Sequence, residues 1–418
     1  MPIDEIKKIA FIGGGTMGSF NSMVAAVAGY DVTVFDVSEE ALQNIPARQK
    51  EWGELLIENW QLPRERIEAG LERVRMTTDP AEAVRDADLL SESVFERLDL
   101  KRDIHTQFDQ LCPAKTIMTT NTSTLLLSDI ESAVQRGDKF AAMHYHQPSV
   151  LVDLVAGPRT SPETMDILKR YIKSTGMTYV LLKKERAGYL HNAMFGALLG
   201  TAMMLKVVGG EEIEDIDRAW MLNQKSDVGP FAMMDHVGFN VIMDISEDQE
   251  SFDDMPLENE LMGNLFRPYV ERGELGMKTG KGFYSYPDPA FSKPEFLEGQ
   301  QENTQISKAM ANAVLSTAMS LVIDGHADME DVDRCWMLTH DPEIGPFGMM
   351  DKKGLDVLHA EIEESVKENP ILEEPLKPIF AFLKTFIEKG ELGAKAGKGF
   401  YSYPNPEFKI PGFLLQTD

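Results

Sequence analysis

The chain has 418 residues, of which 43% are hydrophobic and 26% are charged, a composition typical of soluble proteins with two or three domains. Asp and Glu outnumber Lys and Arg by 68 to 41, giving a formal net charge of −27, which argues against nucleic acid and anionic membranes as partners. The two cysteines, Cys112 and Cys335, fit no metal or redox spacing. The amino terminus does not resemble a signal peptide, and together with this cysteine pattern it predicts a cytoplasmic protein with reduced thiols.

A glycine-rich turn near the amino terminus lies between a predicted strand and a predicted helix. The apolar run Ile9–Gly13 predicts a strand that is buried on both faces. Small and apolar residues at helical spacing follow the turn, and a second predicted strand ends at Asp36. The glycines Gly13, Gly15 and Gly18 have the spacing G-x-G-x-x-G, which in this setting indicates a dinucleotide-binding turn.

The residues of this turn have distinct physical roles in the predicted site. The first glycine permits the tight turn, the second lets the backbone approach a pyrophosphate, and the third lets the helix pack on the strand. The pyrophosphate is expected at the amino terminus of the helix. The expected cofactor contacts are Gly13, Gly15, Thr16, Met17 and Gly18. Asp36 suits the adenosine ribose and repels a 2′-phosphate, so NAD is favoured over NADP, and FAD is the alternative that these residues leave open.

Strand and helix patterns continue to alternate through the first half of the chain. Further strands are predicted at Ala87–Val94, Thr116–Asn121 and Phe140–Pro148. The stretch between residues 36 and 79 predicts a helical hairpin inserted in this domain. Beyond about residue 188, helical patterns replace the strand patterns, and the apolar run 192–205 predicts a buried core helix rather than a membrane span.

The second half carries an internal repeat. DIDRAWML (215–222) returns as DVDRCWML (331–338), and GPFAMMD (229–235) returns as GPFGMMD (345–351), both 116 residues later. GELGMKTGKGFYSYPDPAF (273–291) returns 117 residues later as GELGAKAGKGFYSYPNPEF (390–408). The equivalent residues Trp220 and Trp336 are expected in the core. The predicted fold is an α/β Rossmann domain with the hairpin insertion (1–186), followed by two tandem copies of an all-α domain (187–299 and 300–418).

Several motifs together resemble those of the 3-hydroxyacyl-CoA dehydrogenase family. They are the glycine turn, NTST (121–124), HYHQP (144–148), AGYLHN (187–192) and the repeated GPF and GKGFY blocks, and they span nearly the whole chain. The duplicated helical domain is similar to that of multifunctional β-oxidation proteins, in which the second copy packs on the first as a dimer partner does in single-copy relatives. The resemblance therefore leaves both a monomer and a homodimer open.

The resemblance also implies which residues form the active site. His144 matches the base that takes the 3-hydroxyl proton while hydride leaves the same carbon for NAD. Ser123 and Asn192 match the polar residues that bind the substrate oxygen. Glu96 and Lys101 match family contacts to the cofactor.

The chain departs from the family where a carboxylate should orient the histidine. Relatives carry a glutamate twelve residues after it, and here that position is Ala156. Asp153, three residues earlier, is expected to face the other side of its strand, so we do not take it as a replacement. Loss of such a carboxylate can lower a rate by several orders of magnitude, so an NAD-binding protein with a dormant site is one alternative function.

Two positions next to the predicted base make the site more polar than in the family. His146 stands where the family has an aromatic residue and Gln147 stands where it has asparagine, and both are expected to contact substrate. The pattern H-x-H in His144 and His146 would also suit a metal ion, but no third ligand has convincing spacing, so no metal is predicted.

The expected reaction is NAD-dependent oxidation of a 3-hydroxyacyl-CoA, or reduction of the 3-ketoacyl-CoA. A dehydrogenase of a polar 3-hydroxy acid that carries no CoA is a second alternative. In relatives the inserted hairpin contacts the CoA tail. Here its cations are interspersed with glutamates, which is typical of a solvated helix face; they are Arg48, Lys50, Arg64 and Arg66.

Overall fold

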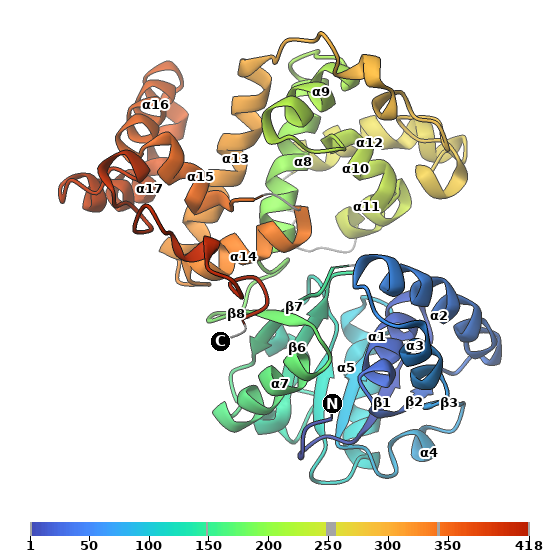
Figure 1. Cartoon of the computed structure of the whole chain (residues 1–418). Helices are drawn as coiled ribbons and strands as arrows, with labels where there is room; N and C mark the ends of the chain where they lie inside the picture. Colours follow the sequence, from blue (N-terminus) through green and yellow to red (C-terminus); the bar gives the residue numbers. More distant parts are fainter. Residues whose placement is uncertain (1, 148, 248–255, 341–342, 417–418) are drawn as a thin grey trace. The chain divides into compact units, whose positions relative to one another are not determined.

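The computed structural model describes residues 2–147, 149–247, 256–340 and 343–416 (Figure 1). The predicted Pro148 of the HYHQP motif lies outside these residues. Contacts divide the chain into two compact units: residues 1–190, 324–341 and 402–418 form the first, and residues 191–323 and 342–401 form the second. The second helical copy therefore contributes residues to both units, whereas the division predicted from the sequence runs along the chain.

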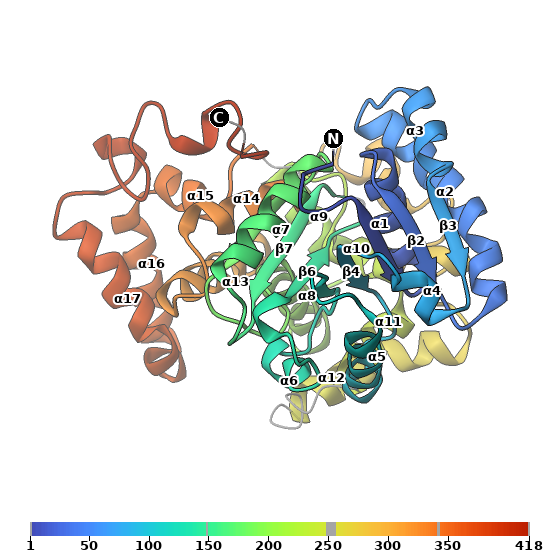
Figure 2. The ribbon, with the colours of Figure 1, turned by 90° about the horizontal axis from the view of Figure 1, so that it is seen from below.

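The first unit is built on one eight-stranded sheet in the order β3-β2-β1-β4-β5-β6-β7-β8. All neighbouring strands are parallel except β6 and β7, which are antiparallel. Figure 2 shows β3 at one edge of this sheet. The first six strands have the order typical of dinucleotide-binding domains. The strands are β1 Lys8–Ile12, β2 Asp31–Phe35, β3 Val74–Thr77, β4 Leu89–Glu92, β5 Ile117–Thr120, β6 Phe140–Tyr145, β7 Leu151–Ala156 and β8 Thr178–Leu182.

Helices pack on both faces of the sheet, as its apolar strands require. One face packs with α1 and α7 in a single apolar cluster. On the other face, His105 of α5 contacts the ring of Phe140 of β6, with ring centroids 4.9 Å apart. The predicted α/β Rossmann domain is thus confirmed. Its helices are α1 Thr16–Val27, α2 Glu39–Asn59, α3 Arg64–Leu71, α4 Pro80–Val84, α5 Leu98–Leu111, α6 Leu127–Glu131 and α7 Pro162–Ser174.

The inserted hairpin is formed by α2 and α3, as predicted, but its last part is a strand. Trp52 of α2 packs edge-on against Phe20 of α1, with ring centroids 5.4 Å apart, which fixes the hairpin to the nucleotide domain. The prediction that helix continues to the end of the insertion is wrong, because Val74–Thr77 pairs with β2 as β3. The sequence VRMT offers only a short alternation, and its partner strand lies about 40 residues earlier.

The outer edge of β8 is covered by residues from much later in the chain. The N–H of Leu181 donates to Asp331 of α14 (Met329–His340) at 3.2 Å, and the N–H of Lys183 donates to the carbonyl of His326 at 2.8 Å. Near the carboxyl terminus, the Gln416 amide donates to the carbonyl of Tyr179 at 3.0 Å. These contacts use the free backbone groups that would otherwise leave β8 as an open edge.

The second unit is helical and repeats one arrangement, as predicted. Helices α8 and α13, which begin the two copies, pack against each other. The equivalents α9 and α14 differ: α9 packs on α8, α10 and α13, whereas α14 packs on β7 and β8 of the first unit. The helices of the second unit are α8 His191–Val207, α9 Ile213–Gln224, α10 Pro230–Val237, α11 Phe239–Glu247, α12 Pro256–Glu271, α13 Thr304–Ile323, α15 Pro346–Lys353, α16 Leu355–Glu368 and α17 Glu373–Ile387.

A buried aspartate explains why the GPF and GKGFY blocks recur together. Asp235, which ends the first GPF block, accepts the N–H groups of Phe283 and Tyr284 at 2.8 and 2.9 Å. In the second copy, Asp351 accepts the N–H groups of Phe400 and Tyr401 at 2.9 and 2.8 Å. Each aspartate ties its helix to a turn that begins two helices later in the same copy, so these motifs are structural. Trp220 and Trp336 are buried, as predicted.

Two further sequence features have simple structural counterparts. The apolar run 192–205 lies in α8, and among the described helices α13 alone is long and apolar enough by composition to cross a membrane, a test that core helices also pass. Cys112 and Cys335 are buried free thiols. Burial raises the pKa of Cys112 to about 12, so this thiol is a poor nucleophile near neutral pH.

Candidate active site

The glycine turn between β1 and α1 is closely packed at its first and third glycines and open at its second. Gly13 has a φ of 106°, and a Cβ on it would lie 2.5 Å from the carbonyl oxygen of Ser93. A Cβ on Gly18 would lie 1.8 Å from the carbonyl oxygen of Gly13, whereas a Cβ on Gly15 would meet nothing within 4 Å. The turn therefore needs glycine at the first and third positions, and it leaves open space at the second, where α1 begins.

Asp36 lies next to this turn at the carboxyl end of β2. Its Oδ2 accepts the N–H of Gly14 at 2.7 Å and its Oδ1 accepts the N–H of Ser38 at 2.9 Å. Arg48 of α2 donates to the carbonyl oxygen of Gly14 at 2.9 Å. A carboxylate at this end of β2 is where dinucleotide-binding domains contact the ribose.

Cations of the inserted hairpin have partners within the protein. Arg64 pairs with Glu54 at 2.6 Å, and Arg66 donates to the carbonyl oxygen of Val27 at 3.2 Å. Arg48 is bonded to the glycine turn, as described above. Three of the four hairpin cations that could meet a CoA phosphate are thus already engaged.

A buried ion-pair network lies beneath the carboxyl ends of β4 and β5. The fully buried Nζ of Lys101 lies 2.8 Å from Glu92 Oε1 and 3.3 Å from Glu96 Oε2. His105 and the hydroxyl of Thr120 lie 3.2 and 2.6 Å from Glu92 Oε2. Burial raises the pKa of Glu92, but Lys101 and His105 together lower it to about 2. The sequence did not point to Glu92, because a carboxylate at the end of an apolar strand shows no partner until the strands are paired.

Glu96 fixes the loop that carries Ser123. Its Oε1 accepts the Thr122 hydroxyl at 2.5 Å and the N–H groups of Ser123 and Thr124 at 2.6 and 2.8 Å. Glu96 and Lys101, predicted as cofactor contacts, are therefore also the support of the Ser123 loop. Their contact with NAD stays a prediction.

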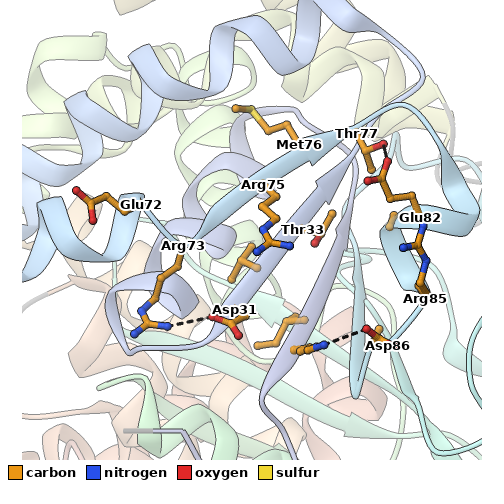
Figure 3. A pocket seen from close by; sticks show the side chains of 15 residues that line it. Asp31, Thr33, Glu72, Arg73, Arg75, Met76, Thr77, Glu82, Arg85 and Asp86 are labelled. Atoms are coloured by element: carbon orange, nitrogen blue, oxygen red, sulfur yellow. Dashed lines mark hydrogen bonds and ion pairs between the residues drawn. The ribbon is translucent and has the colours of Figure 1, made fainter.

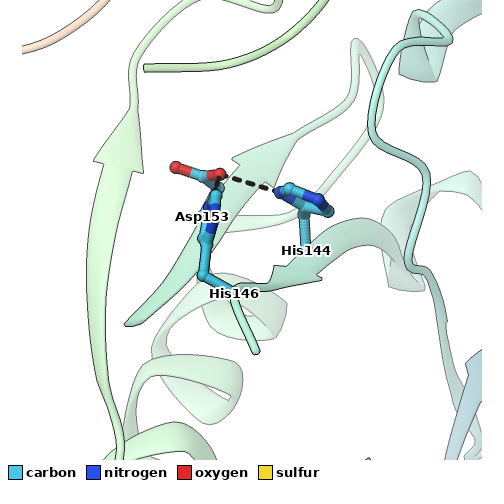
Figure 4. A group of neighbouring side chains, drawn as sticks. All are labelled: His144, His146 and Asp153. Carbon is cyan, nitrogen blue, oxygen red and sulfur yellow. Dashed lines mark hydrogen bonds and ion pairs between the residues drawn. The ribbon is translucent and has the colours of Figure 1, made fainter. Parts of the chain in front are cut away.

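His144 is held between a hydroxyl and a carboxylate near the end of β6. Its Nε2 lies 3.1 Å from Ser123 Oγ, and its Nδ1 lies 3.0 Å from Asp153 Oδ2 (Figure 4). The Nε2 of His146 lies 2.6 Å from the same carboxylate oxygen. The ring of Tyr189 lies against the ring of His144, with the two centroids 5.3 Å apart.

The expectation that Asp153 faces away from His144 is wrong. Strands β6 and β7 are antiparallel, and their register places Asp153 directly opposite His144. Residues opposite each other in such a pair have their side chains on the same face. Ala156 instead pairs with Ala141, so the position of the family glutamate lies on the other face. The same register supplies the third potential metal ligand that the sequence spacing did not reveal, because Asp153 joins His144 and His146.

The site favours a neutral ring at His144. Burial lowers the pKa of His144, and the neighbouring His146 lowers it further, while Asp153 acts in the opposite direction. Burial disfavours the charged form of Asp153, but both imidazoles hold its pKa well below the usual range. An ionised Asp153 beside a neutral His144 can accept a hydrogen bond from its Nδ1–H and leave Nε2 free to act as a base.

The remaining predicted site residues lie in different surroundings. Gln147 is half-buried, and its amide nitrogen has no hydrogen-bond partner among the described residues. Asn192 lies in the first turn of α8, in the second unit, where its Oδ1 is 3.1 Å from His191 Nδ1. Tyr189 was not singled out from the sequence. It is buried with a positive φ of 45°, and its hydroxyl has no partner within the described part of the chain.

A separate pocket of about 400 Å³ lies over β2 and β3 (Figure 3). It extends to Lys8 and Asp31, which begin β1 and β2. Much of its charge is paired internally: Arg73 lies 3.0 Å from Asp31, and Lys8 lies 2.9 Å from Asp86. Ligands of such sheets bind at the carboxyl ends of the strands, so this pocket is not part of the candidate site.

Models of both domains of one known family match the chain. The NAD-binding domain of 3-hydroxyacyl-CoA dehydrogenase matches residues 8–186, and the C-terminal domain of 3-hydroxyacyl-CoA dehydrogenase matches residues 188–286 and 306–403. The chain belongs to the 3-hydroxyacyl-CoA dehydrogenase family. The NAD-binding match supports NAD as the cofactor of this dehydrogenase, and the two C-terminal segments agree with its internal repeat.

Three proteins show what this dehydrogenase is similar to. The mitochondrial hydroxyacyl-coenzyme A dehydrogenase of Rattus norvegicus is 32% identical over 67% of this chain and 91% of its own. A diketoreductase described as acting on dicarbonyl compounds is 34% identical, with a TM-score of 0.62 over 68% of this chain and all of its own. The 3-hydroxybutyryl-CoA dehydrogenase of Escherichia coli K12 shares the fold, with a TM-score of 0.73 over 87% of this chain and 95% of its own at 20% identity.

Proposed function

We propose that this dehydrogenase oxidises a 3-hydroxyacyl-CoA with NAD, or reduces the 3-ketoacyl-CoA in the reverse direction, with His144 as the general base. The observation that carries the proposal is the pairing of His144 with a buried carboxylate at 3.0 Å on one side and with Ser123 at 3.1 Å on the other. A histidine oriented in this way is a suitable base for a substrate hydroxyl.

The positions of the protons on the site residues fit this role. The Nδ1–H of His144 donates to Asp153, which leaves the lone pair of Nε2 to accept the proton of the 3-hydroxyl group. Asp153 then stabilises the imidazolium that forms. The Ser123 hydroxyl can donate to the substrate oxygen, and Asn192 is the proposed second donor. NAD, when bound, accepts the hydride from the same carbon.

A polar 3-hydroxy acid without CoA is the alternative substrate. It is favoured by the engaged cations of the hairpin, by the polar residues His146 and Gln147, and by the similarity to a diketoreductase named for dicarbonyl compounds. The carboxylate of Asp153, 3.0 Å from Nδ1 of His144, argues against the dormant-site hypothesis, which was motivated by Ala156.

The test compares substrates and one variant by following NADH formation. We expect turnover of 3-hydroxybutyryl-CoA by the native protein and at most a residual rate for His144→Ala. If the native protein turns over only free 3-hydroxybutyrate, the proposed substrate becomes the polar acid instead of the CoA thioester. No turnover of either compound, with NAD binding intact by titration, would contradict the proposed function.

A further inference from the structure

His144, His146 and Asp153 form a cluster whose arrangement goes beyond what a base and its carboxylate need. The two histidines are two residues apart at the end of β6, and Asp153 lies opposite the first of them in β7. The pleat therefore turns all three side chains to one face of the sheet. One nitrogen of each ring and one carboxylate oxygen all lie within 4.8 Å of one another (Figure 4).

Among the residues that the structure describes, no lysine or arginine pairs with the carboxylate of this cluster. Asp153 is fully buried, and in the described part of the chain its ion-pair partners are the two imidazoles, with no lysine or arginine. Its second oxygen, Oδ1, is buried and has no hydrogen-bond partner among those residues. A buried carboxylate with no lysine or arginine beside it is costly, so the cluster favours a cation placed between its three side chains.

We propose that His144, His146 and Asp153 bind one divalent transition-metal ion of the Zn²⁺ class, and that its binding switches the dehydrogenase off. Two imidazole nitrogens and a carboxylate oxygen are a ligand set that zinc uses in proteins, with water in the fourth position. The set departs from the family pattern at two places: His146 stands where the family has an aromatic residue, and the carboxylate comes from Asp153 rather than from position 156. The proposal is that this dehydrogenase, unlike relatives with the aromatic residue, is zinc-sensitive.

The distances allow a metal ion after small side-chain rotations. Ligand atoms bonded to Zn²⁺ at about 2.0 to 2.1 Å in tetrahedral geometry lie roughly 3.3 Å apart. Nδ1 of His144 and Nε2 of His146 lie 3.0 and 2.6 Å from Asp153 Oδ2. The gaps to Asp153 Oδ2 must therefore open by about 0.3 and 0.7 Å, and the two ring nitrogens, which lie at most 4.8 Å apart, must come to the same separation.

Inhibition follows from where the proton of the His144 ring must go, and this step rests on the proposed function. A neutral imidazole has one N–H, and a metal ion on Nδ1 forces that proton onto Nε2. Nε2 then donates to Ser123 or to substrate and cannot accept the 3-hydroxyl proton. No redox change of the metal is involved, and removal of the ion restores the free base.

The binding experiment uses the full chain after treatment with a chelator and its removal. Zn²⁺ binding is measured by equilibrium dialysis, and Co²⁺ is used as a probe whose visible absorption reports a low-coordinate site. We expect one ion per chain for the native protein and at least about 100-fold weaker binding for His146→Phe, which removes one ligand. His359→Phe, a matched change in α16 of the second unit, should bind like the native chain.

The activity experiment adds Zn²⁺ to the NAD-linked reaction of the same proteins. We expect Zn²⁺ to stop turnover by the native protein and EDTA to restore it. Zn²⁺ should have no effect on the rate that His146→Phe retains. Equal zinc binding by the native protein and His146→Phe, or none by either, would overturn the site. Binding without an effect on native turnover would overturn the switch. Binding in a protein that turns over no substrate would leave the site in place and refute the proposed function instead.

Discussion

Replacement of Asp153 by asparagine tests the central relation of the candidate site. Asparagine has nearly the same shape, so it keeps the packing of β7 while removing the negative charge beside His144. It can also present its NH₂ group to Nδ1, which would stabilise the tautomer that places the proton on Nε2. We expect a large fall in kcat with NAD binding retained.

The size of the effect follows from the geometry. Nδ1 of His144 lies 3.0 Å from Asp153 Oδ2, and unit charges at that distance attract by about 5 to 6 kcal/mol at an effective dielectric constant of about 20. His146 shares the same oxygen, so we assign about half, or ~3 kcal/mol, to the imidazolium of His144. That energy corresponds to roughly 100-fold in kcat, and a change of tautomer extends the expected range to about 10⁴-fold.

The assay is the rate of NADH formation in the presence of a chelator, for native protein, Asp153→Asn and the double variant Asp153→Asn/Ala156→Glu. The double variant restores a carboxylate at the family position. Because Ala156 pairs with Ala141 and not with His144, we expect it to give no rescue. A kcat for Asp153→Asn within about threefold of native would refute the role of the carboxylate, and rescue by the glutamate would refute the register argument.

Three further predictions concern other parts of the nucleotide domain. In the presence of a chelator, His146→Phe removes a neighbour that lowers the pKa of His144. The pH at which oxidation reaches half its maximal rate should therefore move upward, and an unchanged pH profile would contradict this. Gly18→Ala places a Cβ 1.8 Å from the carbonyl of Gly13, and calorimetric titration should show NAD binding lost or the chain unfolded. Lys101→Met leaves the fully buried Glu92 without its ammonium partner, and denaturant unfolding should show a loss of about 3 to 5 kcal/mol; a loss below about 1 kcal/mol would mean that the pair adds little.

The sequence predicts well those features that depend on neighbouring residues. The glycine turn was predicted correctly because strand, turn and helix follow one another within about 20 residues, and the close approach of Gly18 to Gly13 is local. The repeated GPF and GKGFY blocks were recognisable for a different reason: they recur with nearly the same residues and spacing, although the aspartate that joins each pair bonds to residues 48 to 50 positions away.

Features that depend on which strands are neighbours were harder to predict. Alternation shows which residues of one strand share a face, but not what lies opposite them. That is why Asp153 was expected to face away from His144. A signal was present: His146 and Leu151 are only five residues apart, and a hairpin closing there, as it does through a 3.1 Å backbone hydrogen bond, places Asp153 opposite His144. The strand β3 was missed because its partner β2 is remote in sequence.

The cover over the edge of β8 has a consequence for how the protein is made. The ribosome completes β8 at Leu182, but the last covering residue, Gln416, follows roughly 230 residues later. At about 5 to 20 residues per second this interval is on the order of 10 to 50 s. During that time the nucleotide domain has an exposed strand edge that can pair with another nascent chain. Synthesis from crowded ribosomes should therefore favour aggregation of chains that are stopped before the second copy is complete.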